Sequence, residues 1–192
     1  SNATFGADFK NTAVFADGTW NITDSLRLIG GARWTQDKLS YFHNRVPTPF
    51  AGQPGIRTDL SGFKGSNDSD NVSGRAGLQY DLNDDVMVYA SYARGYKGPA
   101  YNVFFNMTVN NTPVIEAETA DSYELGLKST LLDGRMLVNA AVFDGKYDDF
   151  QANNFLFLNG TLITTLTNAG KVSSKGFELD VQARPNDMLT FG

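Results

Sequence analysis

The chain has 192 residues, no cysteine, one histidine and a formal net charge of −5 at pH 7. Without cysteine it forms no disulfide, thiolate zinc site or cysteine nucleophile, and an acidic balance with no long basic run argues against nucleic-acid binding. The apolar fraction of 41% is sufficient for a folded protein, yet no stretch approaches the roughly 18 consecutive apolar residues that a transmembrane helix requires.

Alternation of apolar and polar side chains is the strongest local signal. Near the C-terminus, Phe177, Leu179 and Val181 are apolar, whereas Glu178 and Asp180 between them are polar. Successive side chains on a strand point to opposite faces, so the pattern predicts strands with one apolar and one polar face. In chain order we predict strands at 10–22, 26–41, 71–81, 86–97, 119–131, 135–148, 151–157, 162–168, 171–184 and from 188 onward. In 135–148 both sets of alternate residues are largely apolar, so its two faces stay unassigned.

Short turns alternate with long connectors along the chain. The short turns contain Asp24, Asp84, Asp133 and Asp187, beside other residues that favour tight turns. The long connectors cover 42–70, 98–118 and 148–170, and the last holds an extra hairpin around Asn159-Gly160. Compact soluble domains seldom carry repeated loops of this length, whereas outer-membrane barrels have short periplasmic turns and long external loops. The pattern favours a barrel wall over a soluble β-sandwich.

Both ends of the chain suggest a piece of a longer protein. Ser1-Asn2-Ala3 resembles the remnant of an expression tag, and the residues from 188 onward are typical of a strand that is just beginning. We therefore predict one partial barrel domain at 4–192. Outside its barrel such a piece has two open strand edges and an exposed apolar face. The isolated chain is expected to self-associate, to close into a smaller barrel or to need detergent.

Several phrases in these strands resemble the barrels of TonB-dependent outer-membrane receptors. They occur in family order and cover 86–184, whereas 10–41 matches more loosely. The phrases are YASYARGYKGPAY at 89–101, ETADSYELGLKS at 118–129, NAAVF at 139–143, YDDFQ at 147–151, NAGK at 168–171 and SKGFEL at 174–179.

The resemblance implies an all-β fold, an antiparallel up-and-down meander that forms part of a transmembrane β-barrel. Such receptors have about 22 strands, of which about ten would lie here, and a plug domain fills the lumen. They reside in the bacterial outer membrane, contact its lipid, and import scarce nutrients such as ferric siderophores with energy from TonB, ExbB and ExbD. We find no segment that resembles a plug or a TonB box, so the chain alone is not expected to transport. A passive porin is the alternative with the same architecture, and a soluble β-sandwich binding module is the other.

Candidate site residues fall into two sets, and no catalytic, cofactor-binding or metal-binding residue is predicted, because a lone histidine makes a weak metal site. Aromatic and basic side chains beside the long connectors suit an anionic ferric chelate. These ligand-contact candidates are Tyr41, His43, Arg45, Arg94, Tyr96, Lys97 and Tyr101. The tyrosines have an alternative place in the aromatic girdle of a membrane barrel.

The second set lies at polar positions of the alternating strands. Its members are expected to face the lumen and to contact the plug or the passing substrate, or to line a wetted wall. These lumen-facing candidates are Arg75, Gln79, Glu124, Lys128, Glu178 and Asp180.

Overall fold

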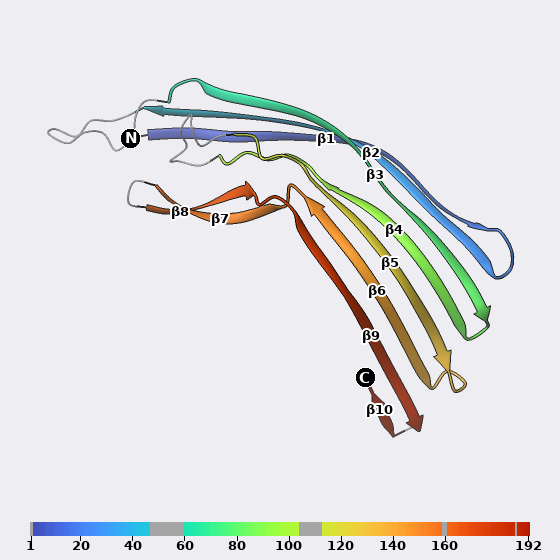
Figure 1. Ribbon diagram of the computed structural model, residues 1–192. Coiled ribbons are helices and arrows are strands. Elements are labelled where there is room, and N and C mark those ends of the chain that lie inside the picture. The colour runs from blue at the N-terminus through green and yellow to red at the C-terminus, as the bar shows by residue number, and fades with distance from the viewer. Residues whose placement is uncertain (1, 47–59, 104–112, 159–160, 187) are drawn as a thin grey trace.

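Ten antiparallel strands make up the regular structure of the described residues (Figure 1). The computed structural model describes residues 2–46, 60–103, 113–158, 161–186 and 188–192. The strands are β1 (Asn2–Asn21), β2 (Leu26–Val46), β3 (Phe63–Asn83), β4 (Val86–Lys97), β5 (Glu118–Leu131), β6 (Met136–Asp148), β7 (Gln151–Leu158), β8 (Thr161–Asn168), β9 (Val172–Asn186) and β10 (Leu189–Phe191). The predicted all-β meander is confirmed.

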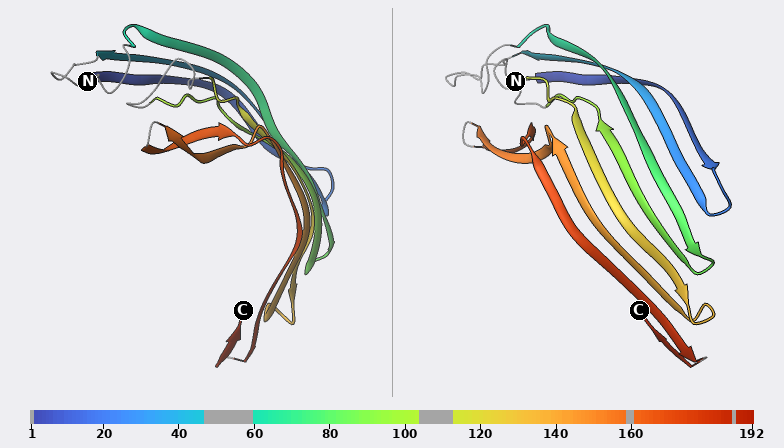
Figure 2. Two further views of the ribbon diagram at one scale, coloured as in Figure 1. Left: turned by 60° about the vertical axis from the view of Figure 1, so that its left-hand side comes forward. Right: turned by 45° about the vertical axis from the view of Figure 1, so that its right-hand side comes forward.

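Eight of the strands form one sheet in the order β1-β2-β3-β4-β5-β6-β9-β10, and β7 pairs only with β8. The chain leaves the sheet after β6, forms the hairpin β7–β8, and returns as β9 beside β6. The wall therefore contains eight of the ten strands, with β1 and β10 at its two edges. Figure 2 shows that the sheet is curved and that the hairpin lies on its concave side.

Three strands extend by five or more residues beyond their predicted bounds. β1 begins at Asn2 and not at 10, β2 continues to Val46, and β3 begins at Phe63 and not at 71. The expected connector 42–70 is therefore wrong over 42–46 and 63–70. β2 is hydrogen-bonded to β1 on one side and to β3 on the other along this part. Ladder hydrogen bonds form between backbones and do not need apolar side chains, so the polar composition of these stretches concealed the strands.

The predicted turn at Asp133 contains three successive residues with positive φ. They are Leu132 at 56°, Asp133 at 55° and Gly134 at 82°. The amide of Arg135 donates to the Leu132 carbonyl at 3.2 Å and closes the turn. The predicted turns at Asp24 and Asp84 also join consecutive strands, whereas Asp187 lies outside the described residues.

Replacement of Leu132 by glycine is expected to stabilise the protein by about 0.5–1 kcal/mol, because glycine removes the steric cost of positive φ and Leu132 is exposed. Urea-induced unfolding of the full-length receptor would measure the change. Leu131→Gly is the control, since Leu131 ends β5 and glycine weakens a strand. Equal losses in both variants would contradict the assignment of strain to Leu132.

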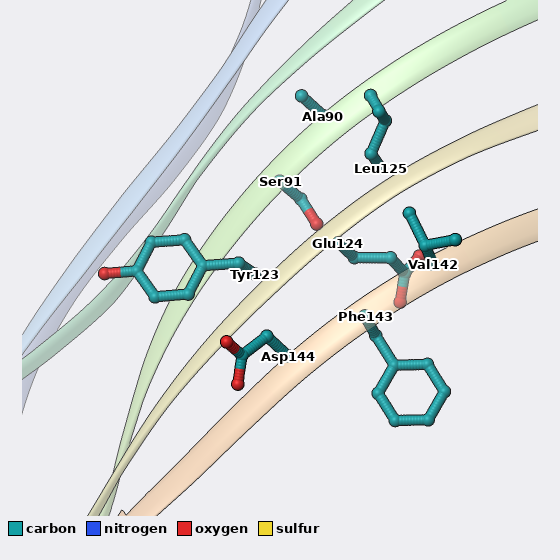
Figure 3. A pocket seen from close by; sticks show the side chains of 8 residues that line it. All are labelled: Ala90, Ser91, Tyr123, Glu124, Leu125, Val142, Phe143 and Asp144. Atoms are coloured by element: carbon teal, nitrogen blue, oxygen red, sulfur yellow. The ribbon is translucent and has the colours of Figure 1, made fainter. Parts of the chain in front are cut away.

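Cross-strand register assigns every side chain of the sheet to one of two faces. Glu178 and Asp180 on β9 lie opposite Ala141 and Asn139 on β6, and we call the face that they share the polar face. Phe177 shares the opposite, apolar face with its partner Val142. The faces of β6 are thereby assigned, with Met136, Val138, Ala140 and Val142 on the apolar face and Leu137, Asn139, Ala141 and Phe143 on the polar face. Figure 3 shows the alternation, with Leu125 and Val142 on one side and Glu124 and Phe143 on the other.

The apolar band crosses the strands at an angle. Its continuous run of apolar side chains ends at Val14, Trp34 and Val72 on β1–β3, which share one row of the register. On β6 and β9 it ends at Val142 and Phe177, which share another row nearer the short turns. From β1 to β9 the end of the apolar band shifts by about one residue per strand. At about 3.3 Å per residue and 4.8 Å between strands, this shift corresponds to a strand tilt of about 35°. Tilted strands of this kind close into barrels.

Candidate ligand-facing site at the loop end of the sheet

Buried side chains gather on the polar face of β2 at the end that carries the long connectors. From Thr35 to Arg45 alternate residues of β2 are buried, and the residues between them are almost all exposed. Leu60, Phe63, Tyr101 and Val103 pack there around Tyr41. We call the set Asp37, Tyr41, His43, Arg45, Tyr96 and Tyr101 the mouth cluster. It brings together five of the seven predicted ligand-contact residues.

Aromatic contacts hold the connectors against the mouth cluster. The ring centroids of Tyr41 and Tyr101 lie 4.4 Å apart, and those of Tyr41 and Phe63 lie 5.8 Å apart. The His43 ring stacks on Phe5 of the neighbouring β1, with centroids 5.4 Å apart. Burial raises the pKa of the Tyr101 hydroxyl, and the nearby Tyr41 and Glu116 act in the same direction. Tyr101 therefore stays protonated and able to donate a hydrogen bond at neutral pH.

Asp37 is the polar centre of the mouth cluster, and sequence reasoning missed it. Its side chain accepts hydrogen bonds from the Asn11 amide at 2.6 Å and from the Tyr96 hydroxyl at 2.9 Å. It is 1% exposed. Gly98 approaches so closely that a Cβ there would lie 2.5 Å from Asp37 Oδ2. One carboxylate thus joins β1, β2 and the end of β4, and the only signal in the sequence was its place among the alternate residues of β2.

Amide side chains tie the hairpin β7–β8 to the connector between β4 and β5. Gln151 donates from Nε2 to the carbonyls of Gly98 and Glu116, at 2.8 and 3.0 Å, and its backbone amide donates to Glu118 at 2.7 Å. Asn102 exchanges two hydrogen bonds with the backbone of Leu166. We call these two side chains, with Asn168, the amide latch. They position the hairpin over the concave side, and sequence reasoning also missed them.

The remaining ligand-contact candidates, Arg94 and Lys97, differ in their surroundings. Arg94 is on the apolar face, where it binds Asp121 at 3.1 Å beside the Tyr92 hydroxyl. Lys97 is exposed and pairs in register with Glu118 at the loop end of β4. Beyond the last β3–β4 pair, Gly74 with Arg94, the division into two faces no longer holds, since Tyr96 alternates with Arg94 and yet reaches Asp37. The structure therefore separates Arg94 from the mouth cluster and leaves Lys97 accessible beside it.

All six lumen-facing candidates share the polar face. Arg75 reaches over Gly31 to Asp17 at 2.7 Å, so one side chain joins β3 to β1. Glu124 accepts a hydrogen bond from the Tyr89 hydroxyl, and the Lys128 ammonium lies 5.7 Å from the centre of the Tyr89 ring. The contacts of the other three are Gln79 with Arg27, Asp180 with Asn139, and Glu178 in register with Ala141.

Within the described ranges no group of three or more His, Asp or Glu side chains could hold a metal ion. No helix in that part of the chain is long and apolar enough to cross a membrane.

A curved, tilted antiparallel wall with one apolar and one polar face, short turns at one end and long connectors at the other, defines a segment of an outer-membrane β-barrel. The chain belongs to the TonB-dependent receptor family, because the family described as "TonB dependent receptor-like, beta-barrel" matches residues 1–192. Members of this family reside in the bacterial outer membrane and are transporters, not enzymes. This family assignment replaces the two alternative interpretations of the sequence, a passive porin and a soluble β-sandwich.

Relatives extend the match over nearly the whole chain. The pesticin receptor of Yersinia pestis is 32% identical over 177 residues, which is 91% of this chain and 24% of that protein. The ferric-pyoverdine 358 receptor of Pseudomonas putida is 28% identical over 174 residues, 90% of this chain and 19% of that receptor. The crystal structure of the ferric yersiniabactin uptake receptor FyuA from Yersinia pestis superposes with a TM-score of 0.75 at 28% identity, covering 96% of this chain and 26% of that one. The chain thus spans about a quarter of the length of its relatives.

Proposed function

We propose that the full receptor imports a ferric siderophore through the outer membrane, with energy that TonB, ExbB and ExbD supply through a plug domain. Relatives of this chain are named for ferric pyoverdine and for ferric yersiniabactin uptake. A copper transporter has a similar fold, with a TM-score of 0.74, but at 19% identity this likeness supports the fold alone. The iron chelate is therefore the better supported substrate.

The observation that carries the proposal is the gathering of connectors and hairpin over the loop end of the polar face. His43 and Arg45 are fully buried in this arrangement, so neither presents an exposed surface to a ligand. Contact with a ligand is then left to exposed side chains beside the mouth cluster. Lys97 offers a cation, and Phe155 and Phe157 offer exposed aromatic rings on β7. This combination suits an anionic chelate with aromatic groups.

We propose that the polar face below lines the lumen and contacts the plug domain. Its carboxylates and cations lie on β1–β5 and β9, and two ion pairs, Arg27–Asp81 and Arg75–Asp17, cross between strands. A charged, hydrogen-bonding wall suits a wetted interior in which a second domain moves. Uptake through this path requires the proton gradient, so an uncoupler abolishes it, whereas a passive pore continues to conduct.

Lys97→Glu in the full-length receptor is expected to lower uptake of an anionic ferric siderophore roughly tenfold, because a charge-assisted contact is replaced by repulsion. Uptake of radioactive iron with ferric pyoverdine and ferric yersiniabactin, in iron-starved cells that express only this receptor, measures the effect. Lys38→Glu is the matched control, since Lys38 is an exposed lysine of β2 on the apolar face. Unchanged uptake in the Lys97→Glu variant would show that Lys97 is not part of the site. If the unaltered receptor imported neither chelate, the assignment of a ferric siderophore as the substrate would be overturned.

A further inference from the structure

Three phenylalanines of β1 lie on the polar face of the sheet, where the other strands carry mostly polar side chains. Phe5, Phe9 and Phe15 pair in register with residues of β2 that belong to this face. The opposite face of the same stretch is polar and carries Thr4, Asp8, Lys10 and Thr12. Phe9 and Phe15 are 57% and 70% exposed. The loop-end half of β1 thus presents aromatic rings on the face that we propose lines the lumen.

Arg33 of β2 lies beside the lowest of these rings. Its guanidinium carbon is 5.8 Å from the centre of the Phe15 ring, and its Nε donates to Thr35 Oγ1 at 3.1 Å. Thr35 is buried and lies two residues nearer the loop end, so this hydrogen bond turns the guanidinium toward the mouth cluster. Among the described residues no carboxylate pairs with Arg33, which is itself exposed.

The two neighbouring arginines nearer the short turns are neutralised. Arg27 donates to both oxygens of Asp81 at 2.6 Å, and Arg75 donates to both oxygens of Asp17 at 2.7 and 2.8 Å. An anion that moves down the polar face of β1–β3 therefore meets the open cation of Arg33 first and paired arginines after it. Such an order suits passage, because a site on a path must attract its ligand and also release it.

We propose that Phe9, Phe15 and Arg33 form a transit site, which holds the ferric chelate after it leaves the mouth cluster and before it passes the plug. A guanidinium beside exposed rings binds an anion that carries aromatic groups. Lys97, Phe155 and Phe157 offer the same pair of chemical groups at the mouth. Arg33 lies four residues below Asp37 on one strand, a step of about 13 Å. The inference rests on the proposed function, because it assumes that an anionic chelate is imported.

Two measurements on the full-length receptor separate transit from capture, in iron-starved cells that express only this receptor. Binding of radioactive ferric pyoverdine and ferric yersiniabactin is measured with an uncoupler present, and the maximal rate of uptake is measured without it. Arg33→Gln is expected to leave the binding constant within about twofold and to lower the maximal rate roughly tenfold. Arg33→Lys keeps the charge and is expected to restore most of the rate. Phe15→Leu removes the ring and is expected to lower the rate roughly threefold.

Lys10→Gln is the matched control, because it removes one cation from the opposite face of β1, and it is expected to leave both measurements unchanged. An unaltered rate in Arg33→Gln would overturn the transit site and leave the proposed function standing. A loss of binding that accounts for the whole loss of uptake would place Arg33 at the mouth and would also overturn it.

Contact of Arg33 with the plug is the competing explanation. Ion conduction by Arg33→Gln in planar bilayers, without an energy source, would show a loosened plug and would overturn the transit site. If the unaltered receptor imported neither chelate, the proposed function and the transit site would both be overturned. A heat-dependent shift in gel mobility shows that each variant is folded, and Phe15→Leu carries the test if Arg33→Gln lacks this shift.

Discussion

Gly74→Ala is expected to cause the largest loss of stability among small substitutions in the wall. A Cβ at Gly74 would overlap the backbone carbonyl oxygen of Gly31 on the neighbouring β2, and it would crowd the Cα of Ala32 as well. Backbone atoms within a ladder cannot turn aside as a side chain does, so β2 and β3 must separate. We expect a loss of about 3 kcal/mol, at the upper end of overpacking effects.

Urea-induced unfolding of the full-length receptor, monitored through the loss of its heat-dependent shift in gel mobility, measures the change in stability. Gly30→Ala is the control, because it lies on β2 beside the same region and a Cβ there meets no atom within 4 Å. We expect its stability to stay within about 0.5 kcal/mol of the unaltered protein. Equal unfolding midpoints for Gly74→Ala and the unaltered receptor would show that the two strands yield, and would contradict the expectation.

Asp37→Ala is expected to loosen the loop end of the sheet and to cost about 2 kcal/mol. The substitution removes the buried acceptor of the partly buried Tyr96 hydroxyl, and a buried donor left without its partner costs about 1–3 kcal/mol. The Asn11 amide loses the same acceptor, but Asn11 is exposed and its amide turns to water. Because Asp37 joins three strands at the mouth cluster, we expect faster proteolysis of the connector between β4 and β5. Siderophore uptake is expected to fall together with this loss of order.

Two comparisons separate the role of the Asp37 contacts from a general loss of charge. Asp68→Ala removes an exposed carboxylate of β3 whose distance to Lys38 is 3.7 Å, and it is expected to change stability by less than about 1 kcal/mol. Tyr96→Phe removes one donor, and a double-mutant cycle with Asp37→Ala is expected to give a coupling energy of about 1 kcal/mol. Additive effects of the two substitutions would show that the hydrogen bond contributes nothing.

The mouth cluster shows which parts of the site could be predicted from sequence. Tyr41, His43, Arg45, Tyr96 and Tyr101 attracted notice as aromatic and basic residues beside long connectors. Asp37 and Gln151 did not, because each acts through partners far along the chain, such as Tyr96 for Asp37 and Gly98 for Gln151. A single sequence without known register contains no local signal for such pairs. Arg94 illustrates the reverse case, since its residue type matched the site while register placed it on the apolar face.

The amino-acid sequence by itself determined the two faces and the turns of this wall. Alternation is a local property with a period of two, and turn residues act on their own backbone angles, so both are legible without a fold. Tertiary structure alone decided how far β1–β3 extend, where β7–β8 lies, and which side chains of β6 belong to the apolar face. These features depend on hydrogen bonds and contacts between distant strands. Backbone ladders are indifferent to side-chain polarity, and register becomes defined only when the neighbouring strand is in place.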